Sequence, residues 1–211
     1  MNEKIQLSRT KVKRKQLIIE VAYQMFLENG ITETSVNDIA DACNITRRTV
    51  YNYFLSKTEL LGILMVMVME NVDDDFHVKY DDSQNGISNM KNMLRTNFEA
   101  YYNHITDFLF ITEVRIYLSY RQEKTTKNEK VYAMHQAFID EIADIIEKGY
   151  LDGSITIDET MSVRDKAKLI YQTLYGYLSV ISVGITNINK EKYDKKCKFF
   201  ENMVIGYLES K

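Results

Sequence analysis

Proline and glycine, the residues that most often break helices and form tight turns, are scarce. The chain of 211 residues has no proline and only eight glycines. Sandwiches and barrels built from short strands need many such turns, so this composition disfavours them. Long helices tolerate neither residue well in their interior, and 45% of the residues are hydrophobic, enough for a substantial core. We therefore expect an all-α protein.

Cysteine and histidine are also rare. Cys43 and Cys197 lie far apart at apolar positions, which indicates buried free thiols in a reducing compartment. His77, His104 and His135 are scattered without the spacing of metal ligands. We expect no metal and no cofactor.

The chain also has no long hydrophobic run. Residues 1–16 are charged and lack the apolar centre of a secretory signal. The most apolar stretch, Leu169–Ile185, is shorter than the roughly 20 residues of a membrane span, and Gln172 and Ser179 interrupt it. A buried helix is the better interpretation, and we expect a cytoplasmic protein without membrane contact.

The charge is unevenly distributed along the chain. The formal net charge is -3, but residues 1–60 carry nine Lys or Arg against seven Asp or Glu. Most of this positive charge falls within Lys4–Lys15, and a second group comprises Arg47, Arg48 and Lys57. Binding to phosphates needs local positive charge and not a basic whole, so the N-terminal part remains a candidate for nucleic-acid binding.

Helical spacing and capping residues divide the N-terminal part into short helices. A first helix over about 10–28 ends at Asn29-Gly30, and Ser35 with Asp38 forms a capping box for a second. Asn44 makes a turn, and Thr46 caps a third helix that buries Val50 and Phe54. A further capping box, Ser56-Lys-Thr-Glu59, begins a fourth.

A polar linker at residues 77–85 leads into longer helices, which make up most of a second domain. We place the first domain at residues 1–57 and the second at residues 58–211. The expected helices of the second domain after the linker cover residues 87–103, 107–122, 127–148, 163–185 and 190–209.

Short helices joined by a tight turn are typical of a helix-turn-helix unit. Its second helix must expose polar side chains to a DNA groove while its apolar residues hold it to the core. Arginine recognises guanine and asparagine recognises adenine in the major groove, whereas hydroxyl groups and free N–H groups at helix starts suit phosphates. Tyr51 is either such a contact or a core aromatic.

The resemblance to a known family is carried by four segments. They are Phe26-Leu-Glu-Asn-Gly30, Thr34-Ser-Val-Asn-Asp-Ile-Ala40, Ile45-Thr-Arg-Arg-Thr-Val-Tyr-Asn-Tyr-Phe54 and Ser56-Lys57 with Leu60-Leu61. Together they resemble the DNA-binding signature of the tetracycline-repressor (TetR) family over about residues 12–62. Arg48 and Asn44 depart from the family, which usually has glycine at both positions.

The resemblance implies a set of DNA contacts. Base contacts would come from the third helix, phosphate contacts from helix starts, and backbone or minor-groove contacts from a basic arm. The full set is Lys11, Lys13, Arg14, Lys15, Ser35, Thr46, Arg47, Arg48, Thr49, Tyr51, Asn52, Tyr53 and Lys57. A cation at a helix start, as at Lys57, opposes the helix dipole, and an external phosphate would explain it.

The resemblance also implies that the second domain forms a homodimer and binds a small-molecule effector. Small and apolar residues on the last two helices favour a dimer interface there, although an intramolecular core is the alternative. The interface set is Leu169, Thr173, Gly176, Val180, Gly184, Phe199, Met203, Val204 and Tyr207.

Aromatic side chains dominate the candidate effector pocket, with ordinary core packing as the alternative. The candidates are Phe98, Tyr101, Tyr102, Phe110, Arg115, Tyr117, Tyr132, Met134, Phe138 and Tyr175. Glu113 and Arg115 lie within an apolar helix, either as an internal pair or as the polar end of a pocket.

Three functions remain to be compared. The first is a transcriptional regulator, most simply a repressor that an effector releases from operator DNA. The second is a helical enzyme, against which the sequence offers no nucleophile elbow, phosphate loop or HExxH motif. The third is a helical interaction module without DNA binding, which the basic arm, Tyr51 and Lys57 disfavour. The first is our prediction.

Overall fold

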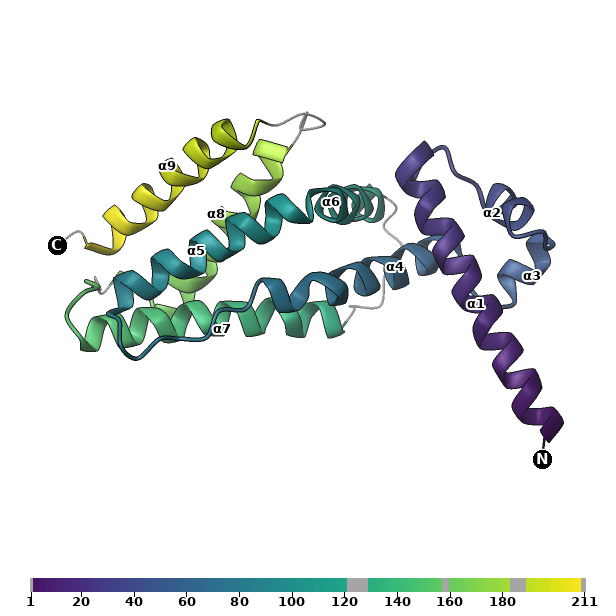
Figure 1. The fold of residues 1–211 in the computed structure, drawn as a ribbon, viewed down its shortest axis with the longest axis horizontal. Helices are drawn as coiled ribbons and strands as arrows, with labels where there is room; N and C mark the ends of the chain where they lie inside the picture. Colours follow the sequence, from purple (N-terminus) through teal and green to yellow (C-terminus); the bar gives the residue numbers. More distant parts are fainter. Residues whose placement is uncertain (1, 121–128, 157–159, 183–188, 210–211) are drawn as a thin grey trace. The chain divides into compact units, whose positions relative to one another are not determined.

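The structure is a computed structural model that describes residues 2–120, 129–156, 160–182 and 189–209 (Figure 1). All regular elements in these ranges are helical, which confirms the predicted all-α class. In chain order they are α1 (Asn2–Asn29), α2 (Val36–Ala42), α3 (Arg47–Tyr51), α4 (Lys57–Val72), the 3-10 turn η1 (Asp73–Asp75), α5 (Gly86–Asn103), α6 (Ile105–Tyr120), α7 (Glu129–Leu151), α8 (Val163–Ser182) and α9 (Lys190–Glu209).

Capping residues define several helix ends as the sequence predicts. The Ser35 hydroxyl accepts from the Asp38 N–H, and the Asp38 carboxylate accepts from the Ser35 N–H, which completes the capping box of α2. Thr46 caps α3 by accepting from the Thr49 N–H. Ser56 accepts from the Glu59 N–H at the start of α4, but the Glu59 carboxylate turns to the Leu55 N–H, so this second box is incomplete.

Helix α1 begins earlier than predicted. It starts at Asn2 and not near residue 10, so the residues expected to form a basic arm lie on a helix. The reason is local: residues 2–9 contain neither proline nor glycine to stop the helix from extending toward the N-terminus.

The chain folds into two compact units. The first unit comprises Met1–Val68 and Phe110–Asn128, and the second comprises Met69–Leu109 and Glu129–Lys211. Helices α4 and α6 each contribute residues to both units. Residues 58–68 and the part of α6 from Phe110 onward, which we expected in the second domain, thus pack with the helix-turn-helix.

The first unit has its own apolar core. Its largest fully buried side chains come from α1, α2, α4, α6 and the segment after α3, and they include Ile18, Phe26, Ile39, Phe54, Leu61 and Phe110. The Tyr23 ring of α1 meets the Phe110 ring of α6 edge to face at 5.0 Å between centroids. Such aromatic pairs add to the stability provided by buried area, so α6 contributes to holding α1 in place.

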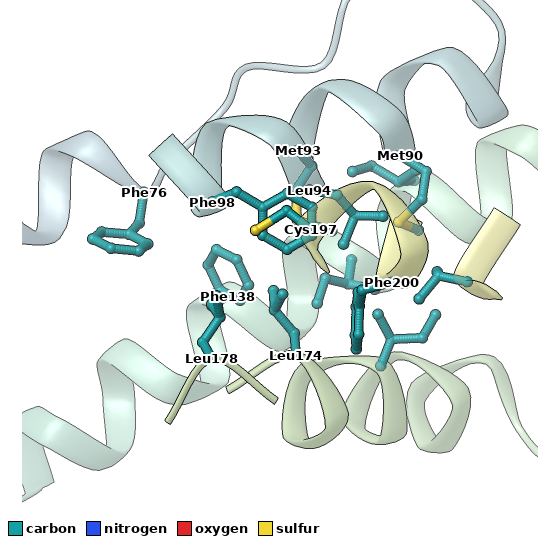
Figure 2. Packing of buried hydrophobic residues seen from close by; sticks show 14 of the residues in the cluster. Phe76, Met90, Met93, Leu94, Phe98, Phe138, Leu174, Leu178, Cys197 and Phe200 are labelled. Atoms are coloured by element: carbon teal, nitrogen blue, oxygen red, sulfur yellow. The ribbon is translucent and has the colours of Figure 1, made fainter. Parts of the chain in front are cut away.

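The core of the second unit is formed by α5, α7, α8 and α9 (Figure 2). Phe98, Phe138, Leu174 and Phe200 represent these four helices in it. Helices α5 and α7 approach most closely at a pair of glycines: a Cβ on Gly86 would lie 2.2 Å from the Gly149 Cα. Any larger side chain at Gly86 would therefore force the two helices apart.

Candidate functional site

The turn between α2 and α3 has the geometry that a helix-turn-helix needs. Asn44 adopts a positive φ of 52°, the left-handed conformation that asparagine tolerates better than most residues. Its neighbours close the turn, because the Ile45 N–H donates to the Ala40 carbonyl at 2.9 Å. Asparagine thus serves where the family usually has glycine.

Helix α3 presents a polar face above an apolar anchor. Val50 and Phe54 are 1% and 2% exposed and hold the helix to the core. The predicted groove-facing residues divide by exposure. Thr46, Arg47, Arg48, Tyr51 and Asn52 are exposed, whereas Thr49 and Tyr53 are half-buried.

Two side chains of this face brace each other. The Arg47 guanidinium lies 5.4 Å from the centroid of the Tyr51 ring, and its Nη2 donates to the Tyr51 hydroxyl at 3.3 Å. Tyr51 is 38% exposed, which excludes the alternative that it is a core aromatic. The pair restricts the rotamers of both side chains, so less conformational entropy remains to be lost on binding.

The four basic residues of α1 from Lys11 to Lys15 are exposed. Lys11, Arg14 and Lys15 are spaced for one face of the helix, and Lys13 points to another. The Lys15 ammonium lies 5.7 Å from the Phe54 ring centroid, next to the end of α3. Part of the positive charge of α1 is therefore adjacent to the recognition helix.

Two hydrogen bonds join Ser35 to Asp38 at the start of α2. Its N–H donates to Asp38 Oδ2 at 2.7 Å, so this donor is already used. The hydrogen bonds from the Ser35 side chain and backbone lower the pKa of Asp38, which keeps a negative charge at the start of α2. The Ser35 N–H is therefore used within the capping box, and the phosphate contact of Ser35 stays a prediction.

Lys57 has partners within the chain. Its ammonium donates to the Ile31 carbonyl and lies 5.7 Å and 5.1 Å from the ring centroids of Phe26 and Tyr117. These contacts explain a cation at the start of α4 without an external anion. The cation at this helix start thus has an explanation within the chain, and the phosphate contact of Lys57 stays a prediction.

Glu113 resolves the alternative left open for the polar residues of α6. Its Oε1 accepts a hydrogen bond of 2.8 Å from the Ile31 N–H in the turn between α1 and α2. Arg115 is exposed. Glu113 thus makes an internal contact with the helix-turn-helix unit rather than with Arg115 or a pocket.

The predicted pocket residues are divided between the two units. Phe110, Arg115 and Tyr117 belong to the first unit, and Tyr132 is 63% exposed. The others lie in the second unit, either buried or half-buried: Phe98, Tyr101, Tyr102, Met134, Phe138 and Tyr175.

A polar group beside this core was not predicted. His77 Nδ1 lies 2.5 Å from Glu141 Oε1, and His77 Nε2 lies 3.4 Å from Asp73 Oδ1. Burial lowers the pKa of His77, but the hydrogen bond and charge of Glu141 and the charge of Asp73 outweigh it, so the pKa is raised. Burial raises the pKa of Glu141 despite the opposing effect of His77.

Aromatic rings lie next to this polar group, because the Phe138 ring centroid is 6.3 Å from that of His77. The Tyr171 and Tyr175 rings lie 4.7 Å apart, and the Phe138 ring lies 5.8 Å and 6.1 Å from them. The Tyr171 hydroxyl also bonds with His135 Nδ1 at 2.7 Å. We call Asp73, His77, Glu141, Phe138, Tyr171 and Tyr175 the histidine–tyrosine cluster. Only the helical spacing of its aromatic residues was visible in the sequence.

The last two helices expose apolar side chains, as the dimer prediction requires. Leu169, Thr173, Gly176 and Val180 follow one face of α8 and are exposed, and so are Phe199, Met203 and Tyr207 on α9. Val204 is an exception: it is 5% exposed and packs in the core of its own chain. Gly184 lies outside the described residues.

Within the described ranges, no three His, Cys, Asp or Glu residues are grouped so as to hold a metal ion. None of the helices described is both long enough and apolar enough to span a bilayer.

The clearest resemblance to known proteins lies in the helix-turn-helix segment. Residues 18–62 match the family "Bacterial regulatory proteins, tetR family". The probable acrEF/envCD operon repressor of Escherichia coli K12 is 46% identical over 51 residues, 24% of this chain and 23% of that protein. The HTH-type transcriptional repressor KstR2 of Mycobacterium tuberculosis is 23% identical over 145 residues, 69% of this chain and 72% of that protein.

Solved structures share the fold over nearly the whole length. The flavonoid-responsive regulator FrrA has a TM-score of 0.61 at 22% identity, covering 92% of this chain and 96% of that one. AibR, in complex with isovaleryl coenzyme A and operator DNA, has a TM-score of 0.62 at 17% identity, covering 90% and 97%. The helix-turn-helix geometry, the family match and the shared fold agree: the chain is similar to helix-turn-helix transcriptional regulators of the tetR family, most clearly over residues 18–62.

Proposed function

We propose that the chain is a repressor that binds operator DNA as a homodimer and is released when a small-molecule effector binds its second unit. The observation that carries this proposal is the exposed face of α3. Arg47, Arg48 and Asn52 project from a helix that Val50 and Phe54 hold to the core. Arginine and asparagine are the side chains that pair bidentately with guanine and adenine in the major groove.

Phosphate contacts surround this face. Lys11, Arg14 and Lys15 on α1 supply positive charge, while Thr46, Tyr51 and Tyr53 supply hydroxyl groups. Thr49 and Lys13 complete the surface, and the Ser35 hydroxyl adds one more donor. These contacts fix position and orientation, while α3 provides the sequence preference. We leave Lys57 out of the direct contacts because the Ile31 carbonyl binds its ammonium.

A homodimer would use the exposed apolar faces of α8 and α9. Val180 is 72% exposed and Phe199 is 68% exposed, and a single chain gains nothing from leaving such groups in water. A twofold interface of this kind would present two copies of α3 to two half-sites. The operator is then expected to be a short palindrome on the bacterial chromosome, which places the protein in the cytoplasm.

The effector would bind within the second unit and act through α4. AibR is a protein of similar fold whose complex contains both isovaleryl coenzyme A and operator DNA. In this chain α4 begins beside the α3 end at Lys57 and continues to Val72. An effector that favours a form of the dimer with mismatched recognition helices would lower operator affinity.

Sequencing of captured DNA tests the proposal. Fragments of the source genome are bound to the purified protein and washed at two salt concentrations. Enrichment of a palindrome that survives the higher salt supports the repressor, since specific contacts outlast the electrostatic ones. Uniform retention that vanishes at the higher salt, from protein checked to be free of bound metabolites, contradicts it. Placing the palindrome before a reporter gene then distinguishes repression from activation.

A further inference from the structure

The carboxylate of Glu141 has an unused acceptor. One oxygen, Oε1, is bound to His77, but the other, Oε2, is buried and has no hydrogen-bond partner among the described residues. A buried acceptor without a donor costs free energy, and a charged one costs more. A ligand that brings a hydrogen-bond donor to this oxygen would remove that cost.

We propose that the effector is an organic cation, such as a protonated amine on an apolar body, and that Glu141 binds its charge beside the rings of Tyr171 and Tyr175. This inference rests on the proposed function, because it concerns the effector that the repressor would recognise.

Charge in the cluster favours a cation. Asp73 and Glu141 face the two ring nitrogens of His77. Even with His77 fully protonated, two carboxylates outnumber one imidazolium. A positive group of the ligand would therefore balance a negative charge, and an anionic group would add to it.

The raised pKa of Tyr175 is consistent with negative charge in the cluster. Burial is the main reason why the pKa of Tyr175 lies well above its usual value, and Tyr171, Asp73, Tyr101 and Glu141 raise it further. Of these neighbours, the carboxylates Asp73 and Glu141 are the sources of negative charge near Tyr175. The Tyr175 side chain as a whole is half-buried.

Aromatic faces supply the second recognition element. Phe138, Tyr171 and Tyr175 form a contiguous group with centroids 4.7–6.1 Å apart, and the His77 ring lies 6.3 Å from Phe138. A cation placed over such faces is stabilised by the ring quadrupoles, more strongly when water is excluded. The same rings provide apolar contact for the body of the ligand.

A second unpaired acceptor lies on α5. Asn97 is 0% exposed, and its Nδ2 donates to the carbonyls of Met93 at 2.9 Å and Phe76 at 3.4 Å. Its Oδ1 has no partner among the described residues. Phe76, whose carbonyl accepts from Asn97, immediately precedes His77 in the chain.

The position of the cluster provides a route to regulation. Asp73 directly follows Val72, the last residue of α4, while Glu141 lies on α7. A ligand cation would compete with His77 for Glu141 and Asp73. The segment from Asp73 to His77 would then change its contacts at the C-terminal end of α4.

Matched small molecules test the class of ligand. The probes are benzylamine, phenethylamine and benzyltrimethylammonium, with benzyl alcohol and phenethyl alcohol as neutral counterparts. Phenylacetate and isovaleryl coenzyme A serve as anions. Isothermal titration of the full-length protein is expected to give about tenfold tighter binding for the better amine than for its alcohol, because one charged hydrogen bond and cation–π contact are added.

Variants locate the charge. Glu141→Gln should abolish the preference for the amine, while Glu147→Gln, an exposed carboxylate on the same helix, should keep it. Tyr175→Leu should weaken amine binding and Tyr175→Phe should restore it, and the thermal unfolding midpoint of each variant verifies folding. The inference is overturned if none of the amines binds, if an alcohol or anion binds as tightly, or if Glu141→Gln keeps the preference.

DNA binding distinguishes failure of the inference about the effector from failure of the proposed function. If salt-resistant DNA enrichment is observed but the amine preference is missing, only the inference about the effector fails. If the salt-resistant enrichment itself is missing, the proposed function fails regardless of amine binding. With both present, the bound amine is expected to lower retention of the palindrome by wild type and by Glu147→Gln, but not by Glu141→Gln.

Discussion

The backbone N–H of Ile31 donates to Glu113 Oε1 at 2.8 Å, so a carboxylate on α6 holds the turn that joins α1 to α2, 82 residues earlier in the chain. The carbonyl of the same residue accepts from Lys57 at the start of α4. Both polar groups of one peptide residue are thus satisfied by side chains from other helices. Ile31 itself is 0% exposed, so the turn is fixed by packing as well.

Removing the carboxylate should destabilise the protein. In Glu113→Ala the Ile31 N–H loses a charged acceptor, and we expect the free energy of unfolding to fall by about 1–2 kcal/mol. Urea denaturation with an unchanged m-value would measure this. Glu28→Ala removes an exposed carboxylate from α1 and is the control, expected to unfold as wild type. Equal midpoints for all three proteins would show that the contact contributes nothing.

Lys57 should act on stability more than on DNA affinity. Replacing it by alanine removes the donor to the Ile31 carbonyl and the cation beside Tyr117, at an expected cost of about 1 kcal/mol. The dependence of operator affinity on salt should remain that of wild type, whereas Lys13→Ala should lower its slope by about one. A slope reduced equally in Lys57→Ala would mean that the ammonium leaves Ile31 for a phosphate.

The sequence predicted local structure well because local rules govern it. Helix starts at Ser35 and Thr46 and the left-handed turn at Asn44 depend on neighbouring residues, and the structure confirms them. The exposed and buried faces of α3 follow from helical period alone. The last helix was expected at residues 190–209 and is found at Lys190–Glu209.

Contacts between distant helices were beyond the reach of one sequence. His77 and Glu141 are 64 residues apart, and nothing local indicates that they meet. Phe110 and Tyr117 have the helical spacing of pocket residues, yet the face they occupy packs in the first unit. Val204 and Met203 are both apolar, but one residue turns a helix by about 100°, so one is buried and the other exposed.

Arg48 should contribute to sequence preference. Its exposed side chain stands on α3 where the family usually has glycine. If it pairs with a base, Arg48→Ala should weaken operator binding by about 1–3 kcal/mol and relax preference at one base position. Selection of binding sites from random DNA measures both. An identical loss on operator and random DNA would instead assign Arg48 to phosphate binding.

The apolar faces of α8 and α9 should control assembly. A double variant, Val180→Glu with Phe199→Glu, places charges on both faces and should convert the dimer to monomer, because unpaired charges are costly to bury in an interface. Analytical ultracentrifugation measures the mass, and operator affinity should fall with it. Leu151→Glu is the control, since this side chain is 83% exposed at the end of α7. A double variant that still sediments as a dimer would place the interface elsewhere.

Stability should depend on pH through His77. Its pKa in the folded protein is raised above the ordinary value of 6.5, because Glu141 and Asp73 outweigh the effect of burial. A raised pKa means that the folded state holds the proton more tightly, so His77 adds stability below pH 6.5 and loses this contribution as the pH rises through the folded value. Urea titrations at several pH values should therefore show a decline in the free energy of unfolding above pH 6.5.

Because Glu141 also has a raised pKa, its ionisation above its usual value of 4.5 adds a separate decline at lower pH. His77→Gln should remove the upper decline and leave the lower one, whereas an unchanged profile would show that the pKa of His77 is the same in the folded and unfolded states.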